Sequence, residues 1–89
     1  MPVTLHLGAD WTVPQRHVLA ILDLQTTDSA ATQAFLRRAR AQGHLITVPE
    51  GESKSAVIAV DDRGIERVYL SPIASATLRG RGVPLTGMA

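Results

Sequence analysis

The sequence contains no cysteine, and it has only one lysine, one tryptophan, one tyrosine and one phenylalanine. Without cysteine the chain forms no disulfide and offers no thiolate ligand to a metal ion. No apolar run is longer than that of residues 18–22, which is far shorter than the ~20 residues that cross a bilayer. The first residues lack the basic and apolar stretches of a secretion signal. We therefore expect a cytoplasmic protein that does not contact a membrane.

The short length restricts how the protein is stabilised. The 89 residues suffice for one domain, expected over residues 1–82, with a frayed tail at residues 83–89. A chain of this size buries only about two-thirds of its unfolded surface. With disulfides excluded, packing against copies of itself is the expected supplement. Trp11 is then either a core residue or an anchor of such an interface.

Apolar patterning predicts a set of strands. They are residues 3–7, 17–24, 45–48, 54–60 and 66–70. The run at 17–24 is apolar almost throughout, as expected for a central strand covered on both faces. Residues 61–64 have the composition of a turn, so the last two strands form an antiparallel hairpin.

A main helix is predicted over residues 30–42, which are rich in strong helix formers. Asp28 or Ser29 is the expected N-cap, and Gly43 stands where a helix ends. Four residues have the spacing of a core-facing stripe: Ala31, Phe35, Leu36 and Ala39.

Ser71 and Pro72 predict the start of a short second helix that runs to about Arg81. The expected fold class is therefore α+β. We expect a small antiparallel sheet of about four to five strands with one main helix and a short C-terminal helix.

No residue pattern indicates catalysis. The three histidines stand singly in strands or strand entries, whereas zinc needs three or four converging ligands. No serine lies in a glycine-flanked elbow, and Ser71 is explained as a helix cap. Asp61 and Asp62 fit a hairpin turn. We therefore expect no enzyme activity, metal, cofactor or small-molecule substrate.

Basic residues gather in two places. Arg37, Arg38 and Arg40 lie on the main helix, and Arg79 and Arg81 lie near the C-terminus. The guanidinium group suits contact with phosphate, although arginines on a solvent-exposed face often serve only solubility. The net charge of +1 favours neither interpretation, because placement matters more than the total.

Five passages carry a resemblance to a known family: His6-Leu7-Gly8, Leu19-Ala20-Ile21-Leu22-Asp23, residues 35–43, Gly51-Glu52-Ser53-Lys54-Ser55-Ala56-Val57-Ile58 and Val68-Tyr69-Leu70-Ser71-Pro72-Ile73-Ala74-Ser75-Ala76-Thr77-Leu78. They resemble the RemB (YaaB-like) family of bacterial extracellular matrix regulators, relatives of the matrix regulator RemA. The resemblance implies a small antiparallel sheet with helices. It also implies a transcriptional regulator of biofilm matrix genes that assembles into a ring and binds DNA through repeated arginines.

The sequence departs from the RemA pattern in one loop. Where RemA-type sequences carry two adjacent arginines for DNA, this chain has Glu52 and Ser53, followed by Lys54. A further family arginine falls nearest His17, beside Arg16. The nucleic-acid-binding residues expected from these matches and from the helix are Arg16, His17, Lys54, Arg37, Arg38 and Arg40.

Two hypotheses remain open. The first is a ring-forming regulator that binds DNA. The second is an oligomeric protein-interaction scaffold without DNA binding, which Glu52 and the near-neutral charge favour.

Overall fold

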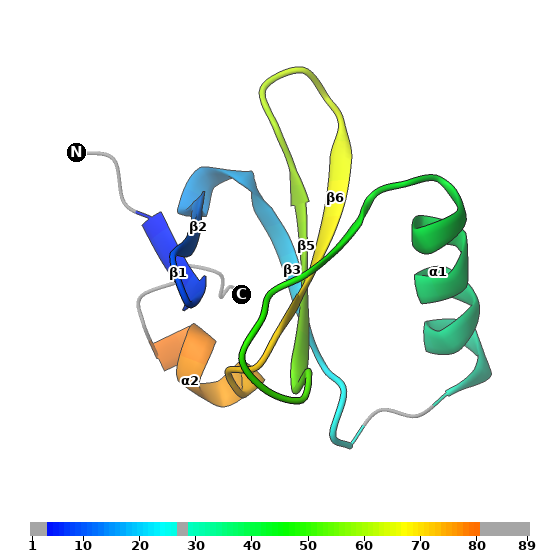
Figure 1. Ribbon diagram of the computed structural model, residues 1–89. Helices are drawn as coiled ribbons and strands as arrows, with labels where there is room; N and C mark the ends of the chain where they lie inside the picture. The colour runs from blue at the N-terminus through cyan, green and yellow to red at the C-terminus, as the bar shows by residue number, and fades with distance from the viewer. Residues whose placement is uncertain (1–3, 27–28, 81–89) are drawn as a thin grey trace.

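The computed structural model describes residues 4–26 and 29–80 (Figure 1). They form six strands, one short 3-10 turn and two helices. In chain order these are β1 Thr4–Gly8, β2 Trp11–Pro14, η1 Gln15–His17, β3 Val18–Asp23, α1 Ala30–Ala41, β4 Leu45–Thr47, β5 Ser55–Val60, β6 Glu66–Ser71 and α2 Ser75–Gly80.

The main sheet is mixed, with the strand order β3-β5-β6-β4. β5 pairs antiparallel with both β3 and β6, whereas β4 pairs parallel with β6. The direction of β4 follows from the connection: α1 carries the chain from β3 at one edge to β4 at the other. Because a helical crossover joins strands that run the same way, β4 runs parallel to β3 and to β6. β1 and β2 form a separate antiparallel ribbon.

The predicted α+β class, main helix, C-terminal helix and hairpin are confirmed. The sheet differs in being mixed, and β2 was not predicted as a strand. The prediction of a central strand at residues 17–24 is wrong, because β3 lies at an edge and Leu19 is 59% exposed. β3 is apolar on both faces for another reason: Ile21 and Leu22 pack into different cores on opposite sides of the sheet.

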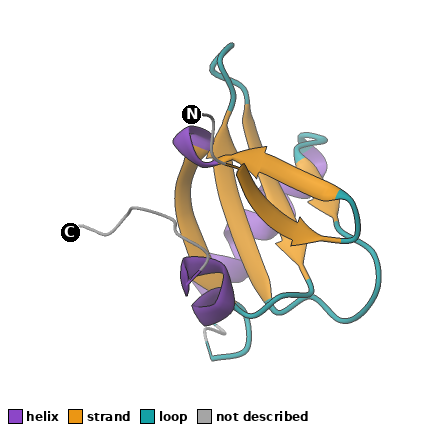
Figure 2. Cartoon of the chain, turned by 90° about the vertical axis from the view of Figure 1, so that its left-hand side faces the viewer, coloured by secondary structure: helices purple, strands orange, loops and turns teal. Residues whose placement is uncertain are grey.

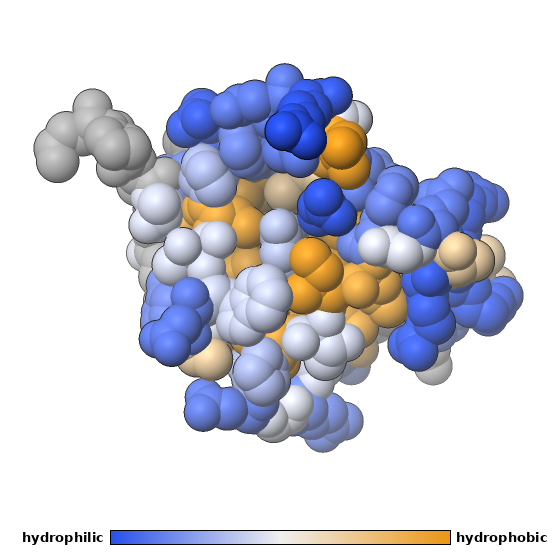
Figure 3. All heavy atoms as spheres, turned by 45° about the horizontal axis from the view of Figure 1, so that its top comes forward, coloured by the Kyte–Doolittle hydropathy of each residue, from blue (hydrophilic) through white to orange (hydrophobic). Residues whose placement is uncertain are grey.

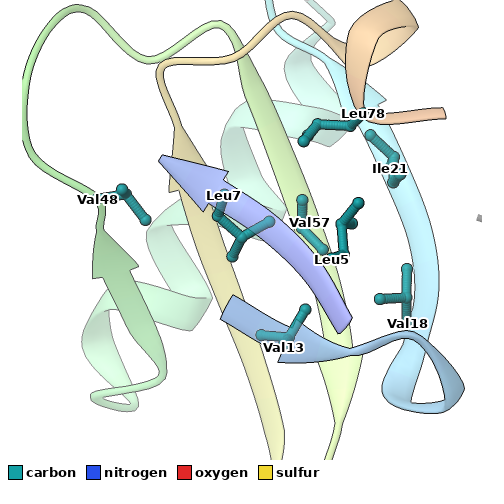
Figure 4. Close-up of a cluster of buried hydrophobic side chains, with 8 residues drawn as sticks. All are labelled: Leu5, Leu7, Val13, Val18, Ile21, Val48, Val57 and Leu78. Carbon is teal, nitrogen blue, oxygen red and sulfur yellow. The ribbon is translucent and has the colours of Figure 1, made fainter. Parts of the chain in front are cut away.

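The first core lies between the β1–β2 ribbon, α2 and the sheet. In Figure 2 the ribbon crosses in front of the sheet, and Figure 4 shows the apolar side chains converging. Alternation along β1 places Leu5 and Leu7 inward, and both are fully buried. They meet Val57 from β5 and Leu78 from α2. This core ties the first and last described elements of the chain together.

The second core lies between α1 and the opposite face of the sheet (Figure 1). Ser29 is the N-cap, as predicted; the alternative, Asp28, lies outside the described residues. Gly43 ends the helix with φ of 77°, a conformation that favours glycine. Of the twelve residues of α1 only Ala39 is buried, and Ala31, which was predicted to face the core, is exposed. α1 therefore covers this face incompletely.

The expected N-cap at Ser71 is wrong. β6 continues through Ser71, and α2 begins only at Ser75. Because Ser71 is fully buried, its hydroxyl bonds to distant parts of the chain instead of capping a helix. Arg81 and residues 83–89, for which the helix end and a frayed tail were predicted, lie outside the described residues. Neither helix in the described chain has the length and apolar character needed to cross a membrane.

Candidate nucleic-acid interface

The largest basic group lies on α1. Arg37, Arg38 and Arg40 are all exposed, and the helix contains no acidic residue. Within the described residues no carboxylate forms an ion pair with any of the three. Arg38 and Arg40 also lie in the last turn, where the partial negative charge of the helix end favours cations. These side chains are available to an anionic partner.

A second basic group, Arg16 and His17, lies in η1. Pro14 ends β2 with φ of −62°, and the chain turns through η1 before it enters β3. The turn brings two consecutive basic side chains beside the β5–β6 hairpin, where Asp62 pairs with both. The Arg16 guanidinium donates to Oδ2 of Asp62 at 3.2 Å, and His17 Nε2 donates to Oδ1 at 3.0 Å. The hydrogen bond from His17, followed by that from Arg16, lowers the pKa of Asp62.

Asp61 builds the turn that presents Asp62. Its carboxylate accepts the backbone N–H groups of Arg63 at 2.8 Å and Ile65 at 3.0 Å. These bonds to the charged form lower the pKa of Asp61, with Ile65 the largest cause. Gly64 completes the turn with φ of 80°, where a Cβ would be strained. The two adjacent aspartates thus have different tasks: Asp61 shapes the turn, while Asp62 binds basic side chains.

Lys54 lies at the other end of β5. Its backbone N–H donates to the Ser71 carbonyl at 2.7 Å, and its side chain is exposed close in sequence to the exposed Glu52. The six residues of β5 separate Lys54 from the hairpin turn that contains Asp62, a span of roughly 20 Å at ~3.3 Å per residue. Within one chain, Lys54 therefore does not share a surface with Arg16 and His17.

The six predicted residues thus form three separate groups in one chain. The structure brings Arg16 and His17 together and places the three α1 arginines together on a helix that contacts β4 and β6, across the sheet from β3. Arg79, from the other predicted basic cluster, donates to the Ile21 carbonyl at 2.8 Å and so has a structural contact. Convergence of the three groups requires more than one copy of the chain.

Asp62 is the residue of this surface that sequence reasoning missed. An aspartate pair before a glycine indicates a turn, and that interpretation fits both residues equally. The ion pair of Asp62 with Arg16 joins residues 46 positions apart, so no local sequence pattern predicts it.

Several residues of the sequence resemblance have structural tasks instead of surface ones. Ser55 and Ser71 are fully buried and lie opposite each other on β5 and β6. The Ser71 hydroxyl donates to the Leu7 carbonyl at 2.7 Å and accepts from the Ile73 N–H at 3.1 Å. The Ser55 hydroxyl donates to the Ile73 carbonyl at 2.7 Å. Three of the matching passages therefore meet at one buried hydrogen-bond network.

Gly8 belongs to the same junction. Its φ of 118° is one that L side chains rarely adopt, and a Cβ there would lie 3.2 Å from Pro72 Cγ. The first passage of the resemblance thus packs directly on the last. A signature built from Gly8, Ser55, Ser71 and Pro72 reports a shared fold more strongly than a shared ligand.

The described residues form a small α+β fold that carries exposed basic groups. The model of the RemA-like family, described as extracellular matrix regulatory protein A-like, matches residues 4–81, and the chain belongs to this family. It is 34% identical over 79 residues to extracellular matrix regulatory protein B of Bacillus subtilis (strain 168), a match that covers 86% of each chain. The resemblance predicted from the sequence is confirmed.

Proposed function

We propose that this chain is a DNA-binding transcriptional regulator of extracellular matrix genes that acts as a ring-shaped oligomer. Its family is one of extracellular matrix regulatory proteins, and control of matrix genes is the regulation we assign to it. The observation that carries DNA binding is the unpaired, exposed arginine cluster on a helix without acidic residues.

Self-association is supported by the second core, which one chain leaves open. Among the described residues, Ala39, Ala56 and Val68 are the ones buried there. Seven larger apolar residues of the described chain pack against them half-buried: Leu22, Leu24, Phe35, Leu36, Leu45, Ile58 and Leu70. Figure 3 shows apolar side chains at the surface between the hairpin and α1. Partly exposed apolar side chains gathered on one face favour association of a small domain. A second copy would bury these side chains and bring separate basic groups into one assembly.

An oligomer that repeats the α1 arginines would also bind DNA more tightly than a single chain. A few phosphate contacts give only weak, salt-sensitive binding. Copies of the α1 arginines around an oligomer act together, because after the first contact the others bind at high effective concentration. The proposed ring therefore explains how a nearly neutral chain binds DNA at all.

The test is binding to a short fluorescent DNA duplex across about 50 to about 200 mM salt. The logarithm of affinity should fall linearly with the logarithm of salt concentration. Each of the exchanges Arg37→Gln, Arg38→Gln and Arg40→Gln should make this dependence shallower. The slope should lose about 0.9 of its magnitude for each phosphate that the variant no longer neutralises. Arg63→Gln, an exchange of the same charge at the exposed hairpin turn, is the control. No binding at the lowest salt would refute the proposal, and an equal change in Arg63→Gln would refute a site on α1.

The second candidate is an oligomeric scaffold that binds protein and not DNA. Two observations favour it: the Asp62 carboxylate occupies the donors of Arg16 and His17, and the exposed Glu52 lies near Lys54 in the sequence and would repel phosphate. This candidate predicts the same oligomer mass with no binding to DNA at low salt.

A further inference from the structure

Arg16 and His17 form a preformed site for an anion with two oxygens. Two consecutive residues each present one N–H donor, and the donors reach separate oxygens of one carboxylate, at 3.2 and 3.0 Å. The backbone fixes their spacing, because η1 lies between β2 and β3 and both strands are paired in sheets. A phosphodiester of nucleic acid likewise offers two oxygens that share one negative charge, and guanidinium groups bind both kinds of anion through paired N–H donors. Asp62 thus stands where a phosphate would bind.

The fold does not depend on Asp62. The bonds that shape the hairpin turn come from Asp61, whose carboxylate and backbone hold Arg63, Gly64 and Ile65. The Asp62 side chain is 73% exposed, and the bonds described for its carboxylate oxygens go to Arg16 and His17. It can therefore swing into solvent without disturbing the strands on either side.

The pair is also weak enough to be displaced. The Arg16 side chain is 63% exposed, and ion pairs this exposed contribute little because water screens them. A phosphate that displaced Asp62 would meet the two vacated donors of Arg16 and His17.

We propose that Asp62 is an autoinhibitory stand-in for phosphate: it occupies the anion site of Arg16 and His17 and must be displaced before nucleic acid binds there. The inference rests on the proposed DNA binding and adds a regulating residue to it. It also reconciles the two candidate functions, because the same chain is a poor DNA binder with Asp62 in place and a better one once it moves.

The test compares Asp62→Asn with Asp10→Asn. Both exchanges remove one negative charge, but Asp10 is exposed in the turn at the far end of β2 from η1 and has no pair with Arg16. The probe is the same fluorescent duplex, of arbitrary sequence since phosphate contact is independent of sequence. Asp62→Asn should raise affinity about twofold to fivefold for each protomer engaged, the range expected for releasing an exposed pair. Its salt slope should steepen by about 0.9 for each further phosphate that the variant neutralises.

A second variant shows whether the higher affinity depends on the site. Arg16→Gln should abolish the effect of Asp62→Asn in the double variant, and it should weaken the wild-type protein only slightly, because Asp62 already occupies Arg16 there. Equal affinities of Asp62→Asn and Asp10→Asn, or a higher affinity that survives Arg16→Gln, would overturn the autoinhibition. If DNA binds but Asp62→Asn changes nothing, the proposed function stands without it. If no variant binds at the lowest salt, both proposals fail.

Discussion

Through its hydroxyl and its carbonyl, Ser71 connects three segments of the chain. It donates to the Leu7 carbonyl and accepts from the Ile73 N–H, while the Ser71 carbonyl accepts from the Lys54 N–H. The residue is fully buried, so water cannot replace a lost partner. A polar group left without a partner in the interior destabilises a fold more than a missing surface bond does.

Ser71→Ala should therefore lower the free energy of unfolding by about 1 to 3 kcal/mol, since it strands the Leu7 carbonyl. Urea denaturation measures the change. Ser53→Ala is the matched control, because Ser53 is partly exposed and lies in the loop before β5, and it should stay within about 0.5 kcal/mol of the wild type. Equal effects of both exchanges would show that the buried network contributes nothing specific.

Asp61 makes the stability of the fold depend on pH in the acid range. Hydrogen bonds from backbone N–H groups lower its pKa below the ordinary 3.8, so in the folded state the carboxylate is favoured. This contribution to stability is present above the unfolded pKa and is lost as the pH falls through the lower, folded pKa. Asp23 and Asp62 have lowered pKa values as well, and they act in the same direction.

In Asp61→Asn the free energy of unfolding should fall less between pH of about 4 and about 2 than in the wild type, because asparagine does not titrate. Its amide oxygen can still accept from Arg63 and Ile65. Urea midpoints measured across this pH range, beside those of the wild type, give the comparison. Two parallel curves would show that the turn carboxylate is not responsible.

Among the elements, α1 is a helix with few buried residues. One of its twelve residues is buried, and it contacts β4 and β6 at one side of the sheet. Its N-terminus depends on Ser29, whose Oγ accepts the Thr32 N–H at 3.0 Å. Elements with few buried contacts open locally, at lower free energy than the whole domain. β5, paired on both sides, is the opposite case.

Ser29→Ala should speed amide hydrogen exchange in α1 by about fivefold, since loss of an N-cap destabilises a helix by about 1 kcal/mol. Exchange in β5 should stay unchanged and is the internal control. Mass spectrometry of peptides from the two elements measures both. If β5 accelerates as much as α1, the helix opens only with the whole domain.

β3 is an edge strand that its surroundings protect. The register shifts between Val18 and Ala20, and Arg79 occupies the outward Ile21 carbonyl. Irregularities and arginines of this kind prevent uncontrolled pairing of strand edges. Self-association through the half-covered apolar face fits this protection better than pairing through β3.

For the whole molecule, the open second core predicts association of the 9.5 kDa chain at micromolar concentration. Leu36→Gln, on the half-buried face of α1, should weaken association about twofold to fivefold, because a partner would bury only the exposed third or less of a side chain whose full burial contributes about 1.5 to 3 kcal/mol. Ala31→Gln places the same side chain at an exposed position of α1 and should have no effect. Sedimentation measures mass, and circular dichroism checks that α1 remains folded. A wild-type chain that sediments at its monomer mass would contradict the prediction.

What the sequence determined by itself depends on residues close together in the chain. The β5–β6 hairpin, the Ser29 cap, the Gly43 helix end and the basic face of α1 follow from local patterns, and the structure confirms the elements. The family follows from passages whose buried residues shape the fold.

Only the tertiary structure decided what lies beside what. The edge position of β3, the parallel pairing of β4, the bond of Ser71 to Leu7 across 64 positions and the capture of Arg16 by Asp62 all depend on strand order. The reason is physical: hydrogen bonds and ion pairs form between groups a few ångströms apart, and the order of strands in a sheet sets those distances without leaving a periodic trace in the sequence.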